Sequence, residues 1–346
     1  MNRFYSSVAK AFYNGLTYLP LDPHKKFTLI RSIRRKILSL RGVLEPKVGI
    51  SLIYSNEGYG HEYWLKQYCG YGGDLYAAIE HGVYFGGNVS DRVNTIYREW
   101  EIGSFITYGQ YRAKYIKDQY PEHDVYLIGP YIQYVSPDKE YQDFIRGGID
   151  DACKTLTLFP CHSVRNGKAV FDFDSLLGST KWFARTHGFK NLIVCISPMD
   201  YNDKIIKAYQ REGFFVVTCG SDPYAFLPRQ RAIFEISDVT ISNDLGTHVG
   251  YSLACQTPHA IMDPVSFQDR IDSGCVAPGV DIGLYQKERV QFFEAFHPKF
   301  YQGKITHDQR ELFNYYWGGN IRQSTVNMNE IFNQCRKSYY SRITRR

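Results

Sequence analysis

The stretch Asp238-Val-Thr-Ile-Ser-Asn-Asp-Leu-Gly-Thr-His248-Val-Gly-Tyr-Ser-Leu-Ala-Cys255 decides the fold of this chain. Its apolar start, 239–241, predicts a short buried strand, and a polar turn then leads into a helix that begins near Gly246. A helix that follows the carboxyl end of such a strand points unpaired backbone N–H groups into the crevice beyond the sheet. Those groups and the helix dipole favour a bound anion, usually a phosphate. The simpler alternative is a strand-to-helix turn with an ordinary N-cap.

The sequence around this stretch alternates between strand and helix patterns. The strand segments are continuous apolar runs, as expected where helices cover both faces of a sheet. Gly188 and Gly213 follow two of the expected helices, where C-caps belong. We therefore predict an α/β second half built on a doubly wound parallel sheet of the nucleotide-binding kind. Its expected strands are 155–159, 192–196, 214–219, 239–241 and 259–262, and its expected helices are 173–187, 203–211, 226–236 and 247–255.

The first half also has α/β patterns, with longer loops. Strands are expected at 48–54, 104–107 and 125–128, a helix is expected at 110–117, and residues 77–80 lead into His81-Gly82. We therefore expect two Rossmann-like domains joined by a polar hinge at 137–151. The expected boundaries are a basic N-terminal helical segment (1–46), a first α/β domain (47–150), a nucleotide-binding domain (151–306), and helices that pack back across both domains and end in a basic tail (307–346).

The composition is that of a folded globular protein. Of the 346 residues, 44% are hydrophobic and 22% are charged, which excludes a disordered chain. The eight cysteines form no CxxC pair, a usage that favours reduced thiols. No apolar run reaches the roughly 18 residues that cross a bilayer, and the first twenty residues lack the pattern of a secretory signal. We therefore expect a cytoplasmic protein.

The net charge of +6 is distributed unevenly. Positive residues cluster without any acid in 25–41 and again in 336–346, which leaves the body of the chain net acidic. This distribution argues against nucleic-acid binding, for which a basic stripe across the fold is typical. Residues 24–41, after Asp22 and Pro23, have the pattern of a basic amphipathic helix. Such a helix either lies on an anionic membrane surface, at the inner face of the membrane, or packs on its own protein.

Four short motifs occur in the second half: Phe159-Pro-Cys-His-Ser163, Gly220-Ser-Asp-Pro223, Phe226-Leu-Pro-Arg-Gln-Arg231 and Ser242-Asn-Asp-Leu-Gly-Thr-His248. In these segments the chain resembles bacterial capsular and surface-polysaccharide biosynthesis glycosyltransferases of the GT-B type. More distantly, His81-Gly82 and the Ser/Asp/Gly-rich turn are similar to the layout of CDP-glycerol-type polymerases of cell-wall polymers. The resemblance implies a GT-B fold, in which an acceptor-side domain (47–150) and a nucleotide-sugar-binding domain (151–306) face each other across a cleft.

The resemblance also implies an activity, namely transfer of a sugar from a nucleotide-sugar donor to a lipid-linked or growing surface polysaccharide. Two alternatives stay open: a sugar-nucleotide epimerase of the same fold, and a non-catalytic component of a polysaccharide assembly complex. In GT-B enzymes helix N-termini and polar or cationic side chains meet the leaving diphosphate, so neither a cofactor nor a metal is expected. A metal-dependent route would use Asp172 and Asp174 as a DxD pair, but acids are common in the first turn of a helix.

Candidate donor-binding residues lie in turns that follow strands of the second half, where parallel sheets bind ligands. Gly246 permits close approach of the backbone to a ligand, and the Arg165 guanidinium suits a bidentate pair with a phosphate. Gly220 and Ser221 are expected beside the nucleoside. The donor and phosphate candidates are Ser242, Asn243, Asp244, Gly246, Thr247, His248, His162, Ser163, Arg165, Gly220 and Ser221.

The catalytic candidates lie in the first half. His81 is the preferred general base for the acceptor hydroxyl, since histidine titrates near neutral pH. Glu80 precedes it, and a structural role for this histidine is equally plausible on the sequence alone. His61, in a glycine-rich loop after the first expected strand, is the rival base.

Overall fold

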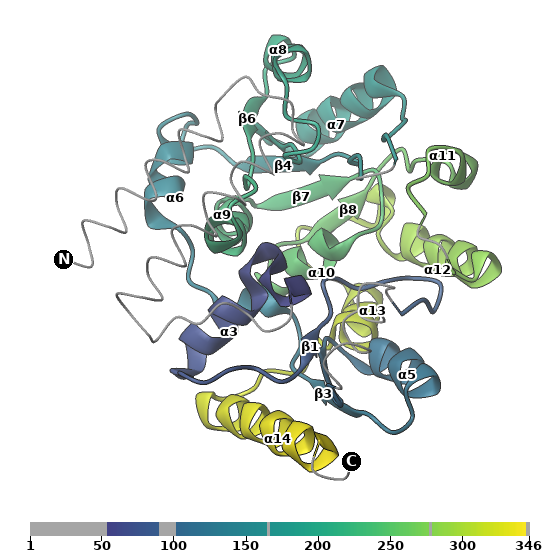
Figure 1. Cartoon of the computed structure of the whole chain (residues 1–346). Coiled ribbons are helices and arrows are strands. Elements are labelled where there is room, and N and C mark those ends of the chain that lie inside the picture. Colours follow the sequence, from purple (N-terminus) through teal and green to yellow (C-terminus); the bar gives the residue numbers. More distant parts are fainter. Residues whose placement is uncertain (1–53, 90–101, 165–166, 277–278, 344–346) are drawn as a thin grey trace.

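The computed structural model describes residues 54–89, 102–164, 167–276 and 279–343, which form two parallel β-sheets surrounded by helices (Figure 1). The first sheet has the order β1-β2-β3 and consists of β1 (Ala78–Ile79), β2 (Ser104–Thr107) and β3 (Asp124–Leu127). The second has the order β6-β5-β4-β7-β8 and consists of β4 (Thr155–Phe159), β5 (Asn191–Cys195), β6 (Phe215–Val217), β7 (Val239–Ser242) and β8 (His259–Ile261). The predicted α/β class is therefore confirmed. The strand expected at 48–54 lies outside the described residues, apart from Tyr54.

The second sheet is doubly wound, as predicted. Its first strand in the chain, β4, lies at the centre and is buried along its whole length. The chain leaves β4 toward β5 and β6 on one side, and then crosses to β7 and β8 on the other. The topological switch point therefore lies between β4 and β7, where Phe159 is in register with Ser242. In such sheets ligands bind beyond the carboxyl ends of these two strands.

The helices that connect these strands begin and end close to their predicted residues. Asp172, Asn202 and Asp222 cap three of them, because each side chain accepts a hydrogen bond from a first-turn N–H group. The last helix is different: Gly246 precedes it with an extended backbone, and no side chain caps it. The four helices are α7 (Phe173–His187), α8 (Asp203–Arg211), α9 (Pro223–Ile236) and α10 (Thr247–Ala254).

The first half departs more from the prediction. Helix α5 (Gln110–Gln119) was predicted, whereas α3 (His61–Cys69) and α6 (Lys139–Arg146) were not. Helix α6 occupies the segment expected to be a hinge, and Asp138 caps it by accepting a hydrogen bond from the Tyr141 N–H group. Two short 3-10 helices complete this half, η1 (Tyr54–Gly60) and η2 (Tyr131–Tyr134).

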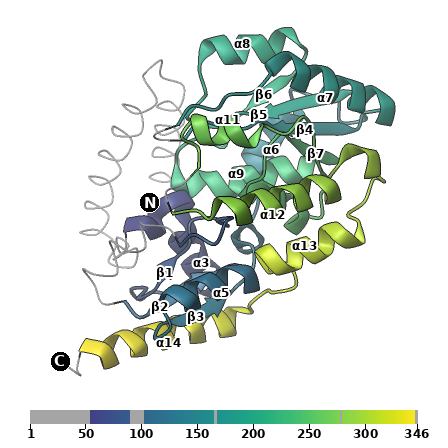
Figure 2. The same ribbon diagram turned by 90° about the vertical axis from the view of Figure 1, so that its right-hand side faces the viewer.

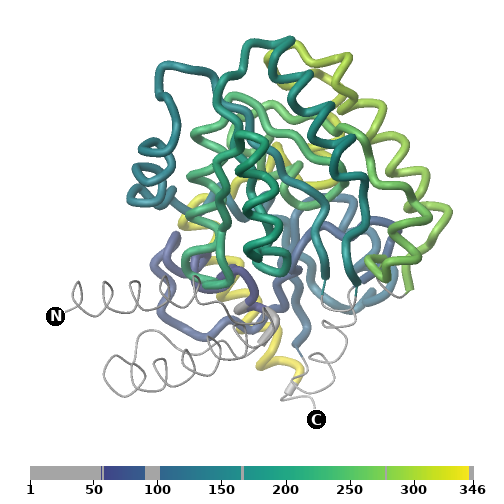
Figure 3. The backbone as a smooth tube through the Cα atoms, turned by 90° about the horizontal axis from the view of Figure 1, so that it is seen from above, coloured from purple at the N-terminus to yellow at the C-terminus, as the bar shows by residue number. Residues whose placement is uncertain are grey.

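The chain after β8 is helical and returns to the first half. Helix α13 packs against both α5 and α10, and α14 packs against α3 and β2. Figure 2 shows α14 running along the underside of the first sheet. Seen from above, α6 lies at one edge of the molecule, and α11 and α12 lie at the opposite edge (Figure 3). These elements are α11 (Phe267–Asp272), α12 (Ile282–Ala295), η3 (Pro298–Phe300), α13 (His307–Trp317) and α14 (Thr325–Ile343).

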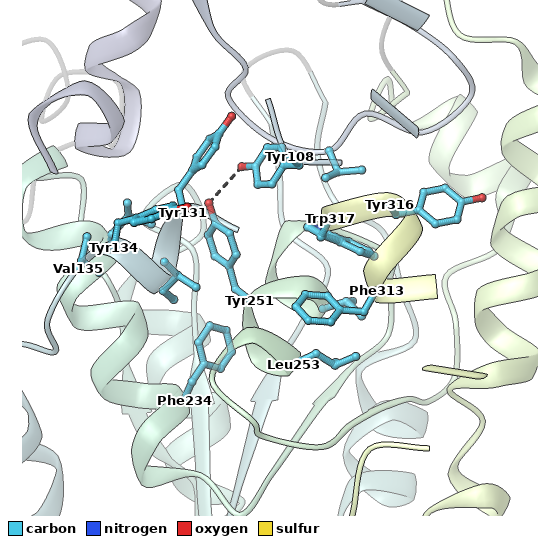
Figure 4. Close-up of a cluster of buried hydrophobic side chains, with 14 of the residues drawn as sticks. Tyr108, Tyr131, Tyr134, Val135, Phe234, Tyr251, Leu253, Phe313, Tyr316 and Trp317 are labelled. Atoms are coloured by element: carbon cyan, nitrogen blue, oxygen red, sulfur yellow. Dashed lines mark hydrogen bonds between the residues drawn. The ribbon is translucent and has the colours of Figure 1, made fainter. Parts of the chain in front are cut away.

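One hydrophobic core runs through both halves. Its members come from the first sheet, from η2, and from α9, α10, α12, α13 and α14. Figure 4 shows Tyr108, which follows β2, and Tyr251 of α10 joined across the two halves by a hydrogen bond between their hydroxyl oxygens, 3.1 Å apart. Beside them Trp317 of α13 is fully buried. The two sheets are therefore held by shared packing as well as by the connecting chain.

Candidate functional site

The N-terminus of α10 meets the first half of the molecule. A Cβ atom on Gly82, in the loop after β1, would lie 2.8 Å from the Thr247 Oγ1 atom. This separation shows that the His81-Gly82 loop lies directly against the first residue of α10. The uncapped N-terminus of α10 therefore lies against the loop that carries the candidate base of the other half, as expected for a site shared by the two halves.

Two of the residues expected to bind the sugar donor form hydrogen bonds within and beside their own turn. The Ser242 hydroxyl is fully buried, donates to the Asp244 backbone oxygen at 2.8 Å, and lies 2.9 Å from His259 Nε2. The Asn243 Oδ1 atom accepts a hydrogen bond from the Cys161 N–H group at 2.6 Å, which ties the ends of β4 and β7 together. Its Nδ2 atom is buried and has no partner among the residues that the structure describes. The expectation for Ser242 is therefore corrected to a structural role, and Asn243 keeps one unused donor.

Asp244 is held by two arginines that were not predicted. Arg289 of α12 donates to its Oδ1 atom at 2.6 Å, and Arg270 of α11 is paired with Oδ2. Burial by itself would raise the pKa of the Asp244 carboxyl, but the two guanidinium groups lower it below its usual value. Asp244 therefore stays ionised and is committed to the arginines, which corrects its expected role as a phosphate ligand. The three side chains together carry one net positive charge beside the turn.

His248 is partly buried, and its ring is neutral near pH 7. Burial and the neighbouring His162 lower the pKa of His248 to about 4, against the opposing effect of a hydrogen bond to the Asp244 backbone. Because its Nε2 atom has no partner in the described part of the chain, that hydrogen bond belongs to the Nδ1–H group. Nε2 is then a buried acceptor. The role of His248 at a phosphate stays a prediction, and its Nε2 atom, as an acceptor, suits a hydroxyl donor of a ligand.

The remaining donor candidates lie in the turns after β4 and after β6, which are also at the carboxyl edge of the second sheet. His162 is exposed, and its Nδ1 atom lies 2.9 Å from the Ser163 backbone oxygen. The Ser163 hydroxyl accepts a hydrogen bond from the Ala169 N–H group, so it stabilises its own loop. Arg165 lies outside the described residues.

The turn after β6 leads directly into α9. Gly220 has a φ angle of 72°, in the left-handed region, and its N–H group donates to the Thr218 hydroxyl. Ser221 is half-buried and precedes the N-cap of α9, Asp222. This turn therefore presents a left-handed glycine backbone and a hydroxyl near the start of a second helix.

Glu80 is a structural residue. It is completely buried, and Arg112 binds both of its oxygens, with the shortest hydrogen bonds from Nε to Oε2 at 3.0 Å and from Nη2 to Oε1 at 2.6 Å. The same arginine donates to the backbone oxygens of Tyr84 and Asn88, at 2.7 Å each. Glu80 therefore holds Arg112, and Arg112 holds the loop after β1. Its expected place among the catalytic groups is corrected, because its oxygens are already engaged.

The two candidate bases lie close together. The ring centroids of His61 and His81 are 5.8 Å apart. His61 is fully buried, its two ring nitrogens have no partner within the described segments, and burial together with His81 lowers its pKa well below the usual value. His81 is half-buried and directly precedes Gly82, the residue that lies against Thr247. Of the two histidines, His81 is therefore the more accessible to solvent.

The described ranges contain neither a metal-ligand cluster nor a helix that could span a membrane. Within them no group of three or more His, Cys, Asp or Glu side chains is arranged to hold a metal ion. Asp172 of the DxD alternative accepts a hydrogen bond from the Ser175 N–H group as the N-cap of α7. No helix in the same ranges has both the length and the apolar character for crossing a membrane. The helix expected at 24–41 lies outside them.

No family model matches the chain, and no curated protein matches it either. Several solved structures match the chain. The wall teichoic acid polymerase TagF is 13% identical, with 78% of this chain and 69% of that chain covered and a TM-score of 0.43. Anabaena Alr3699/HepE in complex with UDP is 10% identical, with 81% and 77% covered and a TM-score of 0.36. TarM is 10% identical, with 76% and 50% covered and a TM-score of 0.33. These likenesses concern the course of the backbone and assign no residue of this chain a role.

Proposed function

We propose that this chain is a metal-independent glycosyltransferase of the GT-B type, which moves a sugar from a nucleotide-sugar donor to a lipid-linked or growing polysaccharide acceptor. The observation that carries the proposal is the contact between Gly82 and Thr247. It joins an uncapped helix N-terminus at the switch point of a doubly wound sheet to a histidine loop of a second parallel sheet. The sequence motifs described above supply the class of reaction.

The proposed chemistry divides between the two halves. In the first half, His81 accepts the proton of the acceptor hydroxyl as that oxygen attacks the sugar carbon. In the second half, the first-turn amides of α10 receive the diphosphate that leaves as the bond to the sugar carbon breaks. The net positive charge of Asp244 with Arg270 and Arg289 favours an anion at the same edge.

Two features of the second half support a nucleotide as the carrier of this diphosphate. The turn at Gly220 and Ser221 lies at the carboxyl edge of the same sheet, which is where such folds bind nucleosides. The buried Nε2 atom of His248 is an unused acceptor that suits a sugar or ribose hydroxyl. We further propose a cytoplasmic protein that binds the inner face of an anionic membrane through residues 24–41.

The test is a panel of UDP-, CDP-, GDP- and dTDP-sugars, measured for binding by calorimetry and for turnover with a lipid-linked glycan acceptor. We expect one donor to bind and to be consumed only when the acceptor is present, with activity retained in EDTA. Conversion of the donor without acceptor would support the epimerase alternative. Absence of binding across the panel, together with stable capture of polysaccharide assembly proteins, would support the non-catalytic alternative.

A further inference from the structure

A stack of three rings connects the two halves of the molecule at the candidate base. Tyr59 of η1 lies between His81 and Phe226 of α9, with ring centroids 4.3 Å and 4.1 Å apart and interplanar angles of 28° and 20°. His81 belongs to the first half and Phe226 to the second. The Tyr59 ring therefore contacts the base on one face and the donor-side helix on the other.

The backbone at Tyr59 is held in a conformation that tyrosine rarely adopts. Its φ angle is 55°, and that of the following Gly60 is 74°, so two successive residues are left-handed. A bulky residue in this region persists where the surrounding structure requires it, often at a functional site. Tyr59 is also 38% exposed, so burial of its ring in a core does not account for its conformation.

The same short segment surrounds the edge of the His81 ring. A Cβ atom on Gly58 would lie 2.6 Å from both the Cε1 and the Nδ1 atoms of His81. The backbone of Gly58 therefore packs directly against the imidazole edge, while Tyr59 covers its face. His61 is a further neighbour of this ring, with 5.8 Å between the ring centroids. Segment 58–61 thus fixes the orientation of the His81 ring.

The other end of the stack leads to the expected donor turn. Phe226 lies in the first turn of α9, which begins at Pro223, two residues after Ser221. A Cβ atom on Gly60 would lie 2.1 Å from the Pro223 backbone oxygen, so η1 and the start of α9 are in close contact. A chain of contacts therefore runs from the donor turn through Phe226 and Tyr59 to His81.

We propose that Tyr59 is a positioning residue that fixes the plane of the His81 imidazole relative to the donor-side helix α9. The proposal rests on the proposed function, in which His81 is the general base. Flat contact is the essential property of the side chain, since both neighbours stack on its ring faces. The phenolic hydroxyl is dispensable for this role.

The experiment compares Tyr59→Phe, which keeps the flat ring, with Tyr59→Leu, which keeps an apolar side chain without one. We expect Tyr59→Phe to retain kcat within twofold. We expect Tyr59→Leu to lower kcat by roughly tenfold or more, since general-base catalysis contributes about 10²–10⁴-fold and depends on geometry. The donor KM should stay within twofold in both variants. Equal kcat in the two variants, or a loss confined to KM, would overturn the proposal.

A second measurement does not depend on turnover. The ring Cε1–H resonance of His81 in histidine-labelled protein is assigned by its absence from His81→Gln. It should be unchanged in Tyr59→Phe and displaced in both Tyr59→Leu and Gly58→Ala, the latter because its new methyl group enters the space of the imidazole. If the wild type turns over no sugar nucleotide, the proposed function fails. Because loss of the Tyr59 ring current alone also moves the resonance, the NOE from His81 Cε1–H to the Gly58 Hα protons, kept in Tyr59→Phe and lost in Tyr59→Leu, then decides whether Tyr59 positions His81. An unmoved resonance in Tyr59→Leu would overturn the proposal.

Discussion

A buried carboxylate at the end of a strand is chemically ambiguous until its partner is known. Glu80 looks like a catalytic acid or base beside His81, yet each of its oxygens accepts hydrogen bonds from Arg112, and Oε2 also accepts one from the Thr107 hydroxyl. The pair has no solvent exposure. Removing one member of such a pair leaves a buried charge without its counter-ion, which is far more costly than the loss of a surface pair.

We expect Glu80→Ala to lower the free energy of unfolding by about 3–5 kcal/mol, because Arg112 would remain charged and buried. Urea denaturation measures this change. Asp151→Ala is the matched control, since its pair with Arg146 has an N–O distance of 4.0 Å and lies at the surface; its effect should stay within about 0.5 kcal/mol. A Glu80→Ala variant as stable as the control would return Glu80 to the catalytic candidates.

The lowered pKa of His248 predicts that the free energy of unfolding falls in acid. Its pKa is about 4 in the folded chain and about 6.5 when unfolded, so between these values the unfolded state binds more protons. Stability is then fully present above pH 6.5 and is lost as the pH falls toward 4, by about 2 kcal/mol at pH 5 for this group. Denaturation at pH 7 and pH 5 measures the loss.

The matched variant for this effect is His248→Gln, which has no titrating ring. Its loss of stability between pH 7 and pH 5 should be smaller than that of the wild type, although not absent. The buried His61 and His259 also have pKa values well below the usual one and act in the same direction. An identical pH dependence in the variant and the wild type would show that His248 titrates normally.

At the scale of elements, the boundaries that the sequence predicts best are those that depend on neighbours along the chain. Helices α7 and α8 have their predicted bounds because apolar periodicity and side-chain caps are local signals. Helices α11 and α12 were missed, and the arginines on them reach Asp244 from 26 and 45 residues away. The candidate site residues were therefore recognised by type, while their partners depend on tertiary contacts that no short motif encodes.

The junction of the β1 loop with α10 gives a prediction at this scale. Gly82→Ala would place a methyl group 2.8 Å from the Thr247 hydroxyl oxygen, closer than side-chain atoms normally approach. We expect a loss of about 1–3 kcal/mol in stability, as for other overpacked contacts, and, on the proposed function, lower glycosyl transfer.

The compensating change is Thr247→Ala, which removes the atom that the new methyl group meets. The double variant Gly82→Ala/Thr247→Ala should recover most of the stability lost in Gly82→Ala, and thermal unfolding of the four proteins of the cycle measures the coupling. Additive effects of the two substitutions would mean that the loop and α10 do not touch in solution.

At the scale of the whole molecule, the two sheets share one core, so they should unfold together. Trp317 of α13 shows this shared packing. It is fully buried, and its ring packs against Gly250 of α10. The same ring contacts Phe85 of the first half and Phe292 of α12. A tail residue is thus a packing partner of both halves. The sequence pattern predicts helices in residues 307–346, but it does not indicate which surfaces of the two halves these helices cover.

We therefore expect Trp317→Ala to lower the free energy of unfolding by about 3–5 kcal/mol while the protein still unfolds in a single transition. Scanning calorimetry tests both parts, because a single two-state transition has equal calorimetric and van't Hoff enthalpies. Trp182→Ala is the matched control: this tryptophan lies on α7 and is 57% exposed, so its loss should change stability by no more than about 0.5 kcal/mol. Two separate transitions in the wild type, or a Trp317→Ala effect on only one of them, would show that the halves are independent folding units and that the shared core contributes little to holding His81 beside α10.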